Sequence, residues 1–427
     1  MKLPLLALLL SVSLLPAQHP PCPQGYDQGL WEKACKLHFA AVVVDTHSDT
    51  TSPILDEGFQ IRERSTTGHM DLPRIREGGL DVQFYSIYVA ASYFGEEDLT
   101  SKKALQASRA NGSARRALDM IDGIQLQIAK NLDRMQACTS TAEITAALAA
   151  GKHAALMGIE GGHAIEGDLR LLRQFHRLGV RYMTLTHTNH NEYADSCAEQ
   201  PPRWNGLNEL GRKVVREMNR LGMMVDVSHV SDKTFTDVMQ VTRAPVIFSH
   251  SSCRALCNHP RNATDEMLRA LAKNGGVIMI NYNSGFVDEE FGKRYEAWRA
   301  PLRIKEKAIA ARYPEGSPEY EAEVKRVNAA AKQPEPPPLA KLIDHFVHAI
   351  EVAGPDHVGM GSDFDGVPST PQELHDVTCL PKITYWLLQR GVAEETVTKV
   401  LGANVLRVFG AVEKVAASLA AEPVIEK

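Results

Sequence analysis

The stretch Val44-Asp-Thr-His-Ser-Asp49 ends an apolar segment with a group of polar side chains, and segments of this kind recur along the 427 residues of the chain. Eight short apolar segments alternate with helix-like stretches, over residues 40–45, 82–89, 154–159, 180–185, 223–227, 245–248, 276–280 and 357–361. Nearly continuous apolar strands are typical of parallel sheets that helices cover on both faces. The alternation therefore predicts an α/β fold, a (β/α)8 TIM barrel.

Polar and glycine residues mark the expected helix boundaries. Ser231 and Thr264 stand where their hydroxyl groups can accept hydrogen bonds from the first turn of a helix. Gly179, Gly222 and Gly275 stand where helices are expected to end, because glycine adopts the left-handed conformation without strain.

Two connections are longer than the rest. Residues 96–151 contain enough polar, Ala-rich sequence for about two helices, and residues 286–339 are charged and helix-prone, ending in Gln333-Pro-Glu-Pro-Pro-Pro338. We therefore expect helical insertions after strands 2 and 7 of the barrel. The second insertion is either a solvated helical excursion, which we favour, or a lid over the active-site face.

The amino terminus has the features of a secretory signal peptide. Lys2 precedes a mainly apolar run over 3–15, and Leu15-Pro16-Ala17 offers a small residue for cleavage. The run is shorter than the ~20 residues that a membrane-spanning helix needs, although an uncleaved anchor is the alternative. We expect residues 1–17 to be removed near Ala17 and residues 18–427 to form one exported catalytic domain, periplasmic or secreted. The terminal segment 421–427 is not a hydrophobic anchor, so we expect no stable membrane anchor in the mature chain.

Charge and cysteine content narrow the class of protein. With 47 Lys and Arg against 52 Asp and Glu, the net charge is −5, which gives no electrostatic reason to bind nucleic acid. None of the seven cysteines has the close paired spacing of a structural zinc site. Cys22 and Cys35 are near enough in sequence to form a local disulfide clamp.

Side chains that can bind metal or transfer protons follow six of the eight predicted strands. They are His47 and Asp49 after the first, Glu160 and His163 after the third, His187 after the fourth, His229 after the fifth, His250 after the sixth and Asp363 after the eighth. The carboxyl ends of barrel strands converge on one face, where catalytic residues collect. Burying so many polar groups costs ~1–3 kcal/mol each unless they are paired or bind metal. A metal site is the economical interpretation, with Asp45, Asp226 and Asp365 as structural residues that orient their neighbours.

The number and type of the residues indicate which metal. The candidate ligands are more than one tetrahedral ion needs: His47, Asp49, Glu160, His229 and His250. Nitrogen and oxygen ligands without thiolate suit zinc. We therefore predict two Zn²⁺ per chain, bridged by a water or hydroxide and by Glu160, whose strand lies between those of the other ligands.

Two residues remain for catalysis. Asp363 can accept a proton from the bridging water and pass it to a leaving amine. His187 can polarise the carbonyl oxygen of the substrate or stabilise the oxyanion that forms from it.

A set of longer motifs carries a family resemblance. They are Asp45-Thr-His-Ser-Asp49, His69-Met-Asp-Leu-Pro-Arg74, Gly78-Gly-Leu-Asp-Val-Gln-Phe84, Gly158-Ile-Glu-Gly-Gly-His163, Leu185-Thr-His187, Arg216-Glu-Met-Asn-Arg-Leu-Gly222, Val225-Asp-Val-Ser-His229, Phe248-Ser-His-Ser-Ser252, Asp356-His-Val-Gly-Met-Gly-Ser-Asp-Phe-Asp-Gly-Val367 and Gly402-Ala-Asn-Val-Leu-Arg-Val-Phe409. In this order they span nearly the whole mature chain. Together they resemble the renal (membrane) dipeptidases, dinuclear zinc enzymes built on an amidohydrolase-type barrel.

The resemblance implies a role for each residue of the site. It implies that His47, Asp49 and Glu160 hold the first zinc, and that Glu160, His229 and His250 hold the second.

The resemblance also implies how the substrate binds. His187 would lie near the scissile carbonyl, and Asp363 on the bridging water. Arg261, eleven residues beyond the last histidine ligand, would bind the carboxylate of a dipeptide substrate. The family also implies a homodimer.

Other functions compete with a dipeptidase. Another amide hydrolase on the same barrel, an N-acyl amino acid deacylase or a lactam hydrolase, would use the same metal site. Barrels with His-x-His on strand one and a carbamylated Lys on strand four are disfavoured, because this chain has His47-Ser-Asp49 and no Lys at the end of strand four. A non-catalytic peptide-binding protein would be expected to have lost ligands or Asp363, and all are present. Tolerance of a D-residue at the C-terminal position of the substrate is left open.

Overall fold

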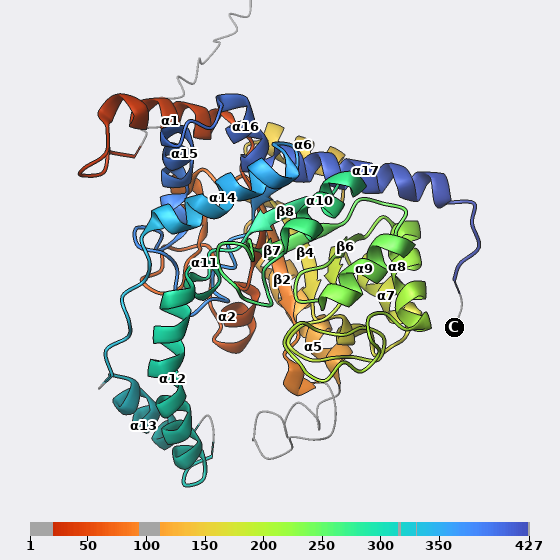
Figure 1. Cartoon of the computed structure of the whole chain (residues 1–427), viewed down its shortest axis with the longest axis horizontal. Helices are drawn as coiled ribbons and strands as arrows, with labels where there is room; N and C mark the ends of the chain where they lie inside the picture. Colours follow the sequence, from red (N-terminus) through yellow and green to blue (C-terminus); the bar gives the residue numbers. More distant parts are fainter. Residues whose placement is uncertain (1–19, 94–111, 315–316, 330, 426–427) are drawn as a thin grey trace, which may run out of the picture.

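A computed structural model describes residues 20–93, 112–314, 317–329 and 331–425 (Figure 1). The predicted signal peptide, residues 1–17, lies outside these ranges. Within them, no helix combines the length and the apolar character needed to cross a membrane.

Eight parallel strands of the described chain close into a barrel, which confirms the predicted TIM-barrel fold. The ring runs β2-β1-β9-β8-β7-β6-β5-β4, and pairing of β4 with β2 over seven residues closes it. The strands are β1 (Val44–Ser48), β2 (Val82–Tyr88), β4 (His153–Glu160), β5 (Val180–Thr184), β6 (Met224–Asp226), β7 (Ile247–Ser251), β8 (Val277–Ile280) and β9 (Val358–Met360).

One strand was not predicted. β3 (Met135–Ala137) pairs with β4 outside the closed ring. Its three residues lie in the Ala-rich insertion and are too few to show a strand pattern in the sequence.

Helices cover the outside of the barrel (Figure 1). In chain order they are α1 (Gln28–Ala40), α2 (Thr51–Asp56), α3 (Leu72–Gly78), α5 (Ser113–Lys130), α6 (Thr141–Ala149), α7 (Leu169–Arg177), α8 (Glu209–Leu221), α9 (Asp232–Val241), α10 (Asp265–Asn274), α11 (Ser284–Val287), α12 (Glu289–Ala310), α13 (Pro318–Ala329), α14 (Leu339–Ala353), α15 (Leu380–Gln389), α16 (Glu394–Thr398) and α17 (Asn404–Leu419). Ser231 and Thr264 cap α9 and α10 through their side chains, as predicted. Gly222 and Gly275 end α8 and α10 in the left-handed conformation.

Both predicted insertions are helical. The first contains α5, β3 and α6, with residues 94–111 outside the described ranges, and the second contains α12 and α13. Figure 1 shows α12 extending away from the barrel with α13 beside its far end, and no residue of α13 is buried. This arrangement favours the solvated excursion over a lid.

The apolar core has two large parts, and a small third cluster joins α1 to α15 through Trp31, Ala34, Cys35 and Tyr385. One lies between the strands and the surrounding helices. The other fills the barrel interior with side chains such as Phe84, Leu156 and Met279, and α17 covers it with Val405 and Phe409. The polar side chains of the candidate site lie beyond this filling, at the carboxyl ends of the strands. All seven cysteines are free thiols, so the predicted Cys22–Cys35 clamp is not formed.

His38 on α1 makes the stability of the fold depend on pH. Its Nε2 lies 2.9 Å from the carbonyl oxygen of Gly78, and its Nδ1 lies 2.8 Å from the Thr384 hydroxyl. Burial lowers the pKa of His38 from 6.5 to about 4. The unfolded chain therefore binds this proton at a higher pH than the folded chain does. The contribution of His38 is complete above pH 6.5 and is lost as the pH falls toward 4.

Replacing His38 with Gln keeps a donor for the Gly78 carbonyl and removes the titration. We expect the stability advantage of the wild type over His38→Gln to shrink by roughly 3 kcal/mol between pH 7 and pH 4. Denaturant titrations of both proteins at several pH values measure this. A difference that does not change with pH would contradict the assignment.

Candidate metal centre

The barrel brings the predicted site residues together at the carboxyl ends of its strands. His47 and His250 lie within β1 and β7, and Glu160 is the last residue of β4. The remaining residues follow their strands directly or within three positions: Asp49 after β1, His187 after β5, His229 after β6 and Asp363 after β9. Of these seven residues only His187 is more than slightly exposed, with 14% of its side chain accessible.

Glu160 lies between two groups of donor atoms. Its Oε2 is 3.5 Å from His47 Nε2, which is itself 3.5 Å from Asp49 Oδ2. Its Oε1 is 2.9 Å from His229 Nε2 and 3.2 Å from His250 Nε2, and those two nitrogens are 3.0 Å apart. Each carboxylate oxygen of Glu160 therefore belongs to a different group.

The two groups fit metal ions. Donor atoms held about 2.0–2.1 Å from one tetrahedral zinc ion lie roughly 3.3 Å apart, close to the separations found here. His47 Nε2, Asp49 Oδ1 and His229 Nδ1 are buried atoms without a hydrogen-bond partner among the described residues. A buried polar atom left without a partner is costly, and coordination would satisfy His47 Nε2. A donor set of imidazole and carboxylate without thiolate suits zinc.

Burial and charge set the protonation of the ligands. Burial and the neighbouring cations hold the pKa values of His229 and His250 well below 6.5, so both rings are neutral, the form that binds metal. Burial alone would raise the pKa of Glu160, but His47 and His187 hold it well below its usual range.

Asp363 is in a different electrostatic environment. Burial, reinforced by the negative charges of Asp49 and Glu160, raises the pKa of Asp363 to about 8. Asn281 Nδ2 donates a hydrogen bond of 2.8 Å to Asp363 Oδ2 and fixes the carboxyl group. Oxygen and nitrogen atoms of His47, Asp49 and Asp363 lie within 4.8 Å of one another, so Asp363 faces the His47 group. A carboxyl group with a pKa near neutral can both take and give a proton.

Arg261 lies behind the second group of ligands. Its guanidinium donates to the carbonyl oxygen of His250 at 3.0 Å and to the Ser251 hydroxyl at 3.2 Å, and its Nε has no partner. The guanidinium lies 5.4 Å from the ring centre of Phe286. Arg261 is only 7% exposed, and within the described chain no carboxylate forms an ion pair with it. A buried arginine without an anionic partner is suited to bind a carboxylate ligand.

The structure adds residues that sequence reasoning missed. Tyr182, in β5, donates to the Thr46 carbonyl and lies 2.8 Å from His47 Nδ1. Tyr88, at the end of β2, packs its ring 4.9 Å from that of His187. Asn281 follows β8 directly, which is the position that marked the other site residues, so its place could have been noticed.

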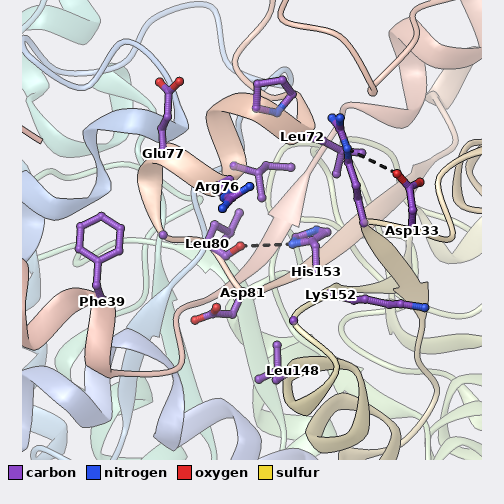
Figure 2. Close-up of a pocket in the computed structure, with 15 residues that line it drawn as sticks. Phe39, Leu72, Arg76, Glu77, Leu80, Asp81, Asp133, Leu148, Lys152 and His153 are labelled. Atoms are coloured by element: carbon purple, nitrogen blue, oxygen red, sulfur yellow. Dashed lines mark hydrogen bonds and ion pairs between the residues drawn. The ribbon is translucent and has the colours of Figure 1, made fainter. Parts of the chain in front are cut away.

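A cavity of about 730 Å³ opens at the opposite end of the barrel (Figure 2). Its lining includes Leu80, Asp81 and His153, which stand at the amino ends of β2 and β4, and His153 Nδ1 bonds the Leu80 carbonyl. His153 and Glu160 are at opposite ends of β4, roughly 23 Å apart at 3.3 Å per residue. The cavity is therefore separate from the candidate metal centre.

Comparison with known proteins identifies the family. The model of the membrane dipeptidase family, peptidase family M19, matches residues 31–423. The chain belongs to this family. Dipeptidase tcpJ of Claviceps purpurea is 37% identical over 364 residues, 85% of this chain and 74% of that protein. Dipeptidase aclJ of Aspergillus oryzae is 38% identical, covering 83% of this chain and 72% of that protein.

Solved structures agree with this membership. The probable dipeptidase PvdM from Pseudomonas aeruginosa has the same fold, with a TM-score of 0.75 at 23% identity over 92% of this chain and all of that chain. A metallopeptidase from Rhodobacter sphaeroides, liganded with a phosphinate mimic of L-Ala-D-Ala, is 26% identical with a TM-score of 0.68, covering 87% of this chain and 99% of that chain. As a member of the membrane dipeptidase family, the chain is a metallo-dipeptidase with a cluster of His, Glu and Asp metal ligands.

Gly366 provides a test of the centre. A Cβ atom at this position would overlap Asp49 Oδ2 and crowd Asp363 Oδ1. We expect Gly366→Ala to weaken metal binding by roughly 10- to 100-fold, as disturbed support of metal ligands typically does. Metal retained after dialysis against a chelator measures this.

Gly123→Ala is the matched control. Gly123 lies inside α5, and a Cβ atom added there would be at an ordinary contact distance of 3.6 Å from Ile54. If both variants retain metal equally, the absence of a side chain at Gly366 is not needed to place the metal-binding residues.

Proposed function

We propose that this chain is an exported dipeptidase that uses two zinc ions to hydrolyse the peptide bond of a dipeptide. The observation that carries the proposal is the division of donor atoms around Glu160. Its Oε2 lies near His47 Nε2, which is also near Asp49 Oδ2, while its Oε1 lies near His229 and His250. One carboxylate between two donor groups is what a bridging ligand needs.

In this proposal His47, Asp49 and Glu160 hold one ion, and Glu160, His229 and His250 hold the other. When bound, the two ions would lower the pKa of a water shared between them and polarise the substrate carbonyl. Substrate binding, stabilisation of the carbonyl oxygen and proton transfer are the work of side chains of the protein.

Arg261 binds the free carboxylate at the C-terminal end of the dipeptide. The support is its burial beside the second donor group and the lack of an anionic partner within the described residues. Because the carboxylate is held at a fixed place, the peptide bond next to it, which is the single peptide bond of a dipeptide, is placed at the metal centre.

His187 and Asp363 act on the reacting atoms. His187, with Nε2 3.8 Å from Glu160 Oε1, donates a hydrogen bond to the oxygen of the scissile carbonyl as negative charge develops there. Asp363 takes a proton from the attacking water and gives it to the nitrogen of the leaving amine. The raised pKa of Asp363, about 8, and the fixed position of its Oδ2 against Asn281 support this role.

The proposal includes acceptance of a D-residue at the C-terminal position. Its support is the Rhodobacter sphaeroides relative, which is liganded with a mimic of L-Ala-D-Ala. Export to the periplasm or outside the cell rests on the signal-like residues 1–17, and residues 18–427 would then form the single mature domain. A homodimer rests on the family resemblance alone.

Metal content and substrate range test the function together. We expect about two zinc ions per chain and cleavage of both L-Ala-L-Ala and L-Ala-D-Ala. The corresponding dipeptide amides should be poor substrates, because they lack the carboxylate that Arg261 would bind. Arg261→Ala should raise KM for the free dipeptides and remove this discrimination, with zinc retained.

Two other outcomes would contradict the proposed function. Two zinc ions with turnover of N-acetyl amino acids or lactams, but not of dipeptides, would identify a deacylase or lactam hydrolase. A protein that neither binds added zinc nor gains activity would overturn the ligand set.

Asp363→Asn separates a proton carrier from a ligand. The amide keeps the shape of the side chain but cannot transfer the proton. We expect kcat to fall by roughly 10²–10⁴-fold, the usual contribution of general acid–base catalysis, with unchanged zinc content. Loss of zinc in this variant would assign Asp363 to the metal instead.

A further inference from the structure

His250 is held from behind by a serine and an aspartate. Its Nδ1 lies 2.7 Å from Ser249 Oγ, and Ser249 Oγ lies 2.5 Å from Asp226 Oδ2. Asp226 is fully buried at the end of β6, one strand away from β7, which carries the other two residues. The three side chains form a continuous row that ends at the metal-facing ring.

The direction of the hydrogen bonds along this row follows from a count of protons. A serine hydroxyl has one proton, and an ionised carboxylate can only accept. Ser249 therefore donates to Asp226, and its oxygen must accept from His250 Nδ1–H. The neutral ring has a single N–H, so His250 Nε2 carries a lone pair directed at Glu160 and His229.

His47 is held in the same way by a different residue. The Tyr182 hydroxyl donates its only proton to the Thr46 carbonyl at 3.1 Å, since a carbonyl can only accept. The same oxygen, 2.8 Å from His47 Nδ1, must then accept from that nitrogen. Two unrelated side chains thus put a proton on the Nδ1 atoms of two stacked rings whose centres are 3.8 Å apart.

His229 has no such support. Its Nδ1 is buried and has no hydrogen-bond partner among the described residues. The hydroxyl partners are therefore specific to two of the three proposed histidine ligands.

We propose that Asp226, acting through Ser249, is a positioning residue that fixes the tautomer of His250 so that its Nε2 is ready to bind metal, and that Tyr182 is a positioning residue that holds the proton on Nδ1 of His47 and so turns Nε2 of that ring toward Glu160. This inference rests on the proposed ligand set. Partners of this kind keep a ligand from losing free energy to a change of tautomer when metal binds.

The surroundings of Asp226 predict what an amide would do in its place. Asp226 Oδ1 accepts from the backbone N–H groups of Ser228 and Ser249, at 3.0 and 2.8 Å. In Asp226→Asn the amide oxygen must take this position, because two N–H groups can only donate. The NH2 group then takes the place of Oδ2, which accepts from both Ser249 Oγ and Thr184 Oγ1 in the wild type, and its two protons can be donated to both hydroxyl oxygens. The freed hydroxyl proton of Ser249 turns to His250 Nδ1 and favours the tautomer with the proton on Nε2, where the metal should bind.

The first measurement is of tautomers in the metal-free, 15N-histidine-labelled protein by NMR. We expect His250 to carry its proton on Nδ1 in the wild type and on Nε2 in Asp226→Asn, with His250→Gln providing the assignment. Because this readout needs no metal, it tests the row of hydrogen bonds separately from the proposed function. The Nε2–H tautomer of His250 in the wild type would overturn the inference.

The second measurement is of Zn²⁺ affinity, by competition with a chelating dye. We expect Asp226→Asn to weaken binding by roughly 10- to 100-fold. Ser249→Ala should cost less, because His250 is then free to adopt either tautomer. In the double variant, Asp226→Asn should add nothing to the effect of Ser249→Ala, because no hydroxyl remains to turn. If Asp226 has a structural role only, the losses of Zn²⁺ affinity in the two single variants should add in the double variant. Additive losses would therefore refute the inference.

Asp45→Asn is the matched control. Asp45 is also a buried strand aspartate that accepts from a serine, with Ser362 Oγ at 2.5 Å and Ser362 N at 2.8 Å. Asp45 and Ser362 bond the backbone of His47, at 3.3 and 3.1 Å, but neither bonds an imidazole nitrogen. We expect this variant to lose less Zn²⁺ affinity than Asp226→Asn and to leave the tautomer of His250 unchanged. An equal loss in Asp45→Asn and Asp226→Asn would assign both to general destabilisation.

His250→Ala distinguishes failure of the inference from failure of the proposed function. If this variant loses zinc while Asp226→Asn binds it normally, the ligand set stands and the positioning role is wrong. If His250→Ala binds two zinc ions as tightly as the wild type, the ligand set itself is wrong. Tyr182→Phe tests the second support, and we expect it to weaken zinc binding with unchanged occupancy of the His250 tautomer.

Discussion

The close approach of Glu160 to His47, His229 and His250 is the constraint on which the open end of the barrel depends. A buried carboxylate loses several kcal/mol of solvation, and it remains charged only where positive or hydrogen-bonding groups surround it. The ends of three other strands, β1, β6 and β7, supply those groups from across the barrel, and no single segment of the chain could. The closed barrel is thus what allows the carboxylate to be both buried and ionised.

The environment separates groups of similar chemistry into different roles. Glu160 and Asp363 are both buried carboxyl groups at strand ends, yet one has its pKa held far below the ordinary range and the other has it raised to about 8. Histidines surround the first, while the negative charges of Asp49 and Glu160 act on the second. The same contrast suits Glu160 to remain an anion and Asp363 to exchange a proton near neutral pH, as the proposed function requires.

Sequence alone was sufficient for the residues whose position follows from strand order. His47, Glu160, His229 and His250 stand at the ends of apolar segments, and a parallel barrel must bring such ends together. The sequence alone could not reveal the contact of Tyr182 with His47 or the need for glycine at position 366. Tyr182 looks like one more apolar member of a strand, and its contact with His47 depends on which strands are neighbours in space. Gly366 is required because Asp49 approaches it from more than 300 positions away in the chain, and no local pattern records that approach.

The filled interior of the barrel limits how substrate can enter and how products can leave. Phe84, Leu156 and Met279 occupy the space below the strand ends, and α17 seals the amino end with Phe409. Among the described residues this packing leaves no passage through the barrel, so the substrate and both products of the proposed reaction would enter and leave at the carboxyl ends of the strands. In the proposed function, the fragment that Arg261 does not bind would leave first, and the fragment whose carboxylate Arg261 binds would have to leave before another substrate could enter. That second product would then compete with the substrate for the same entrance.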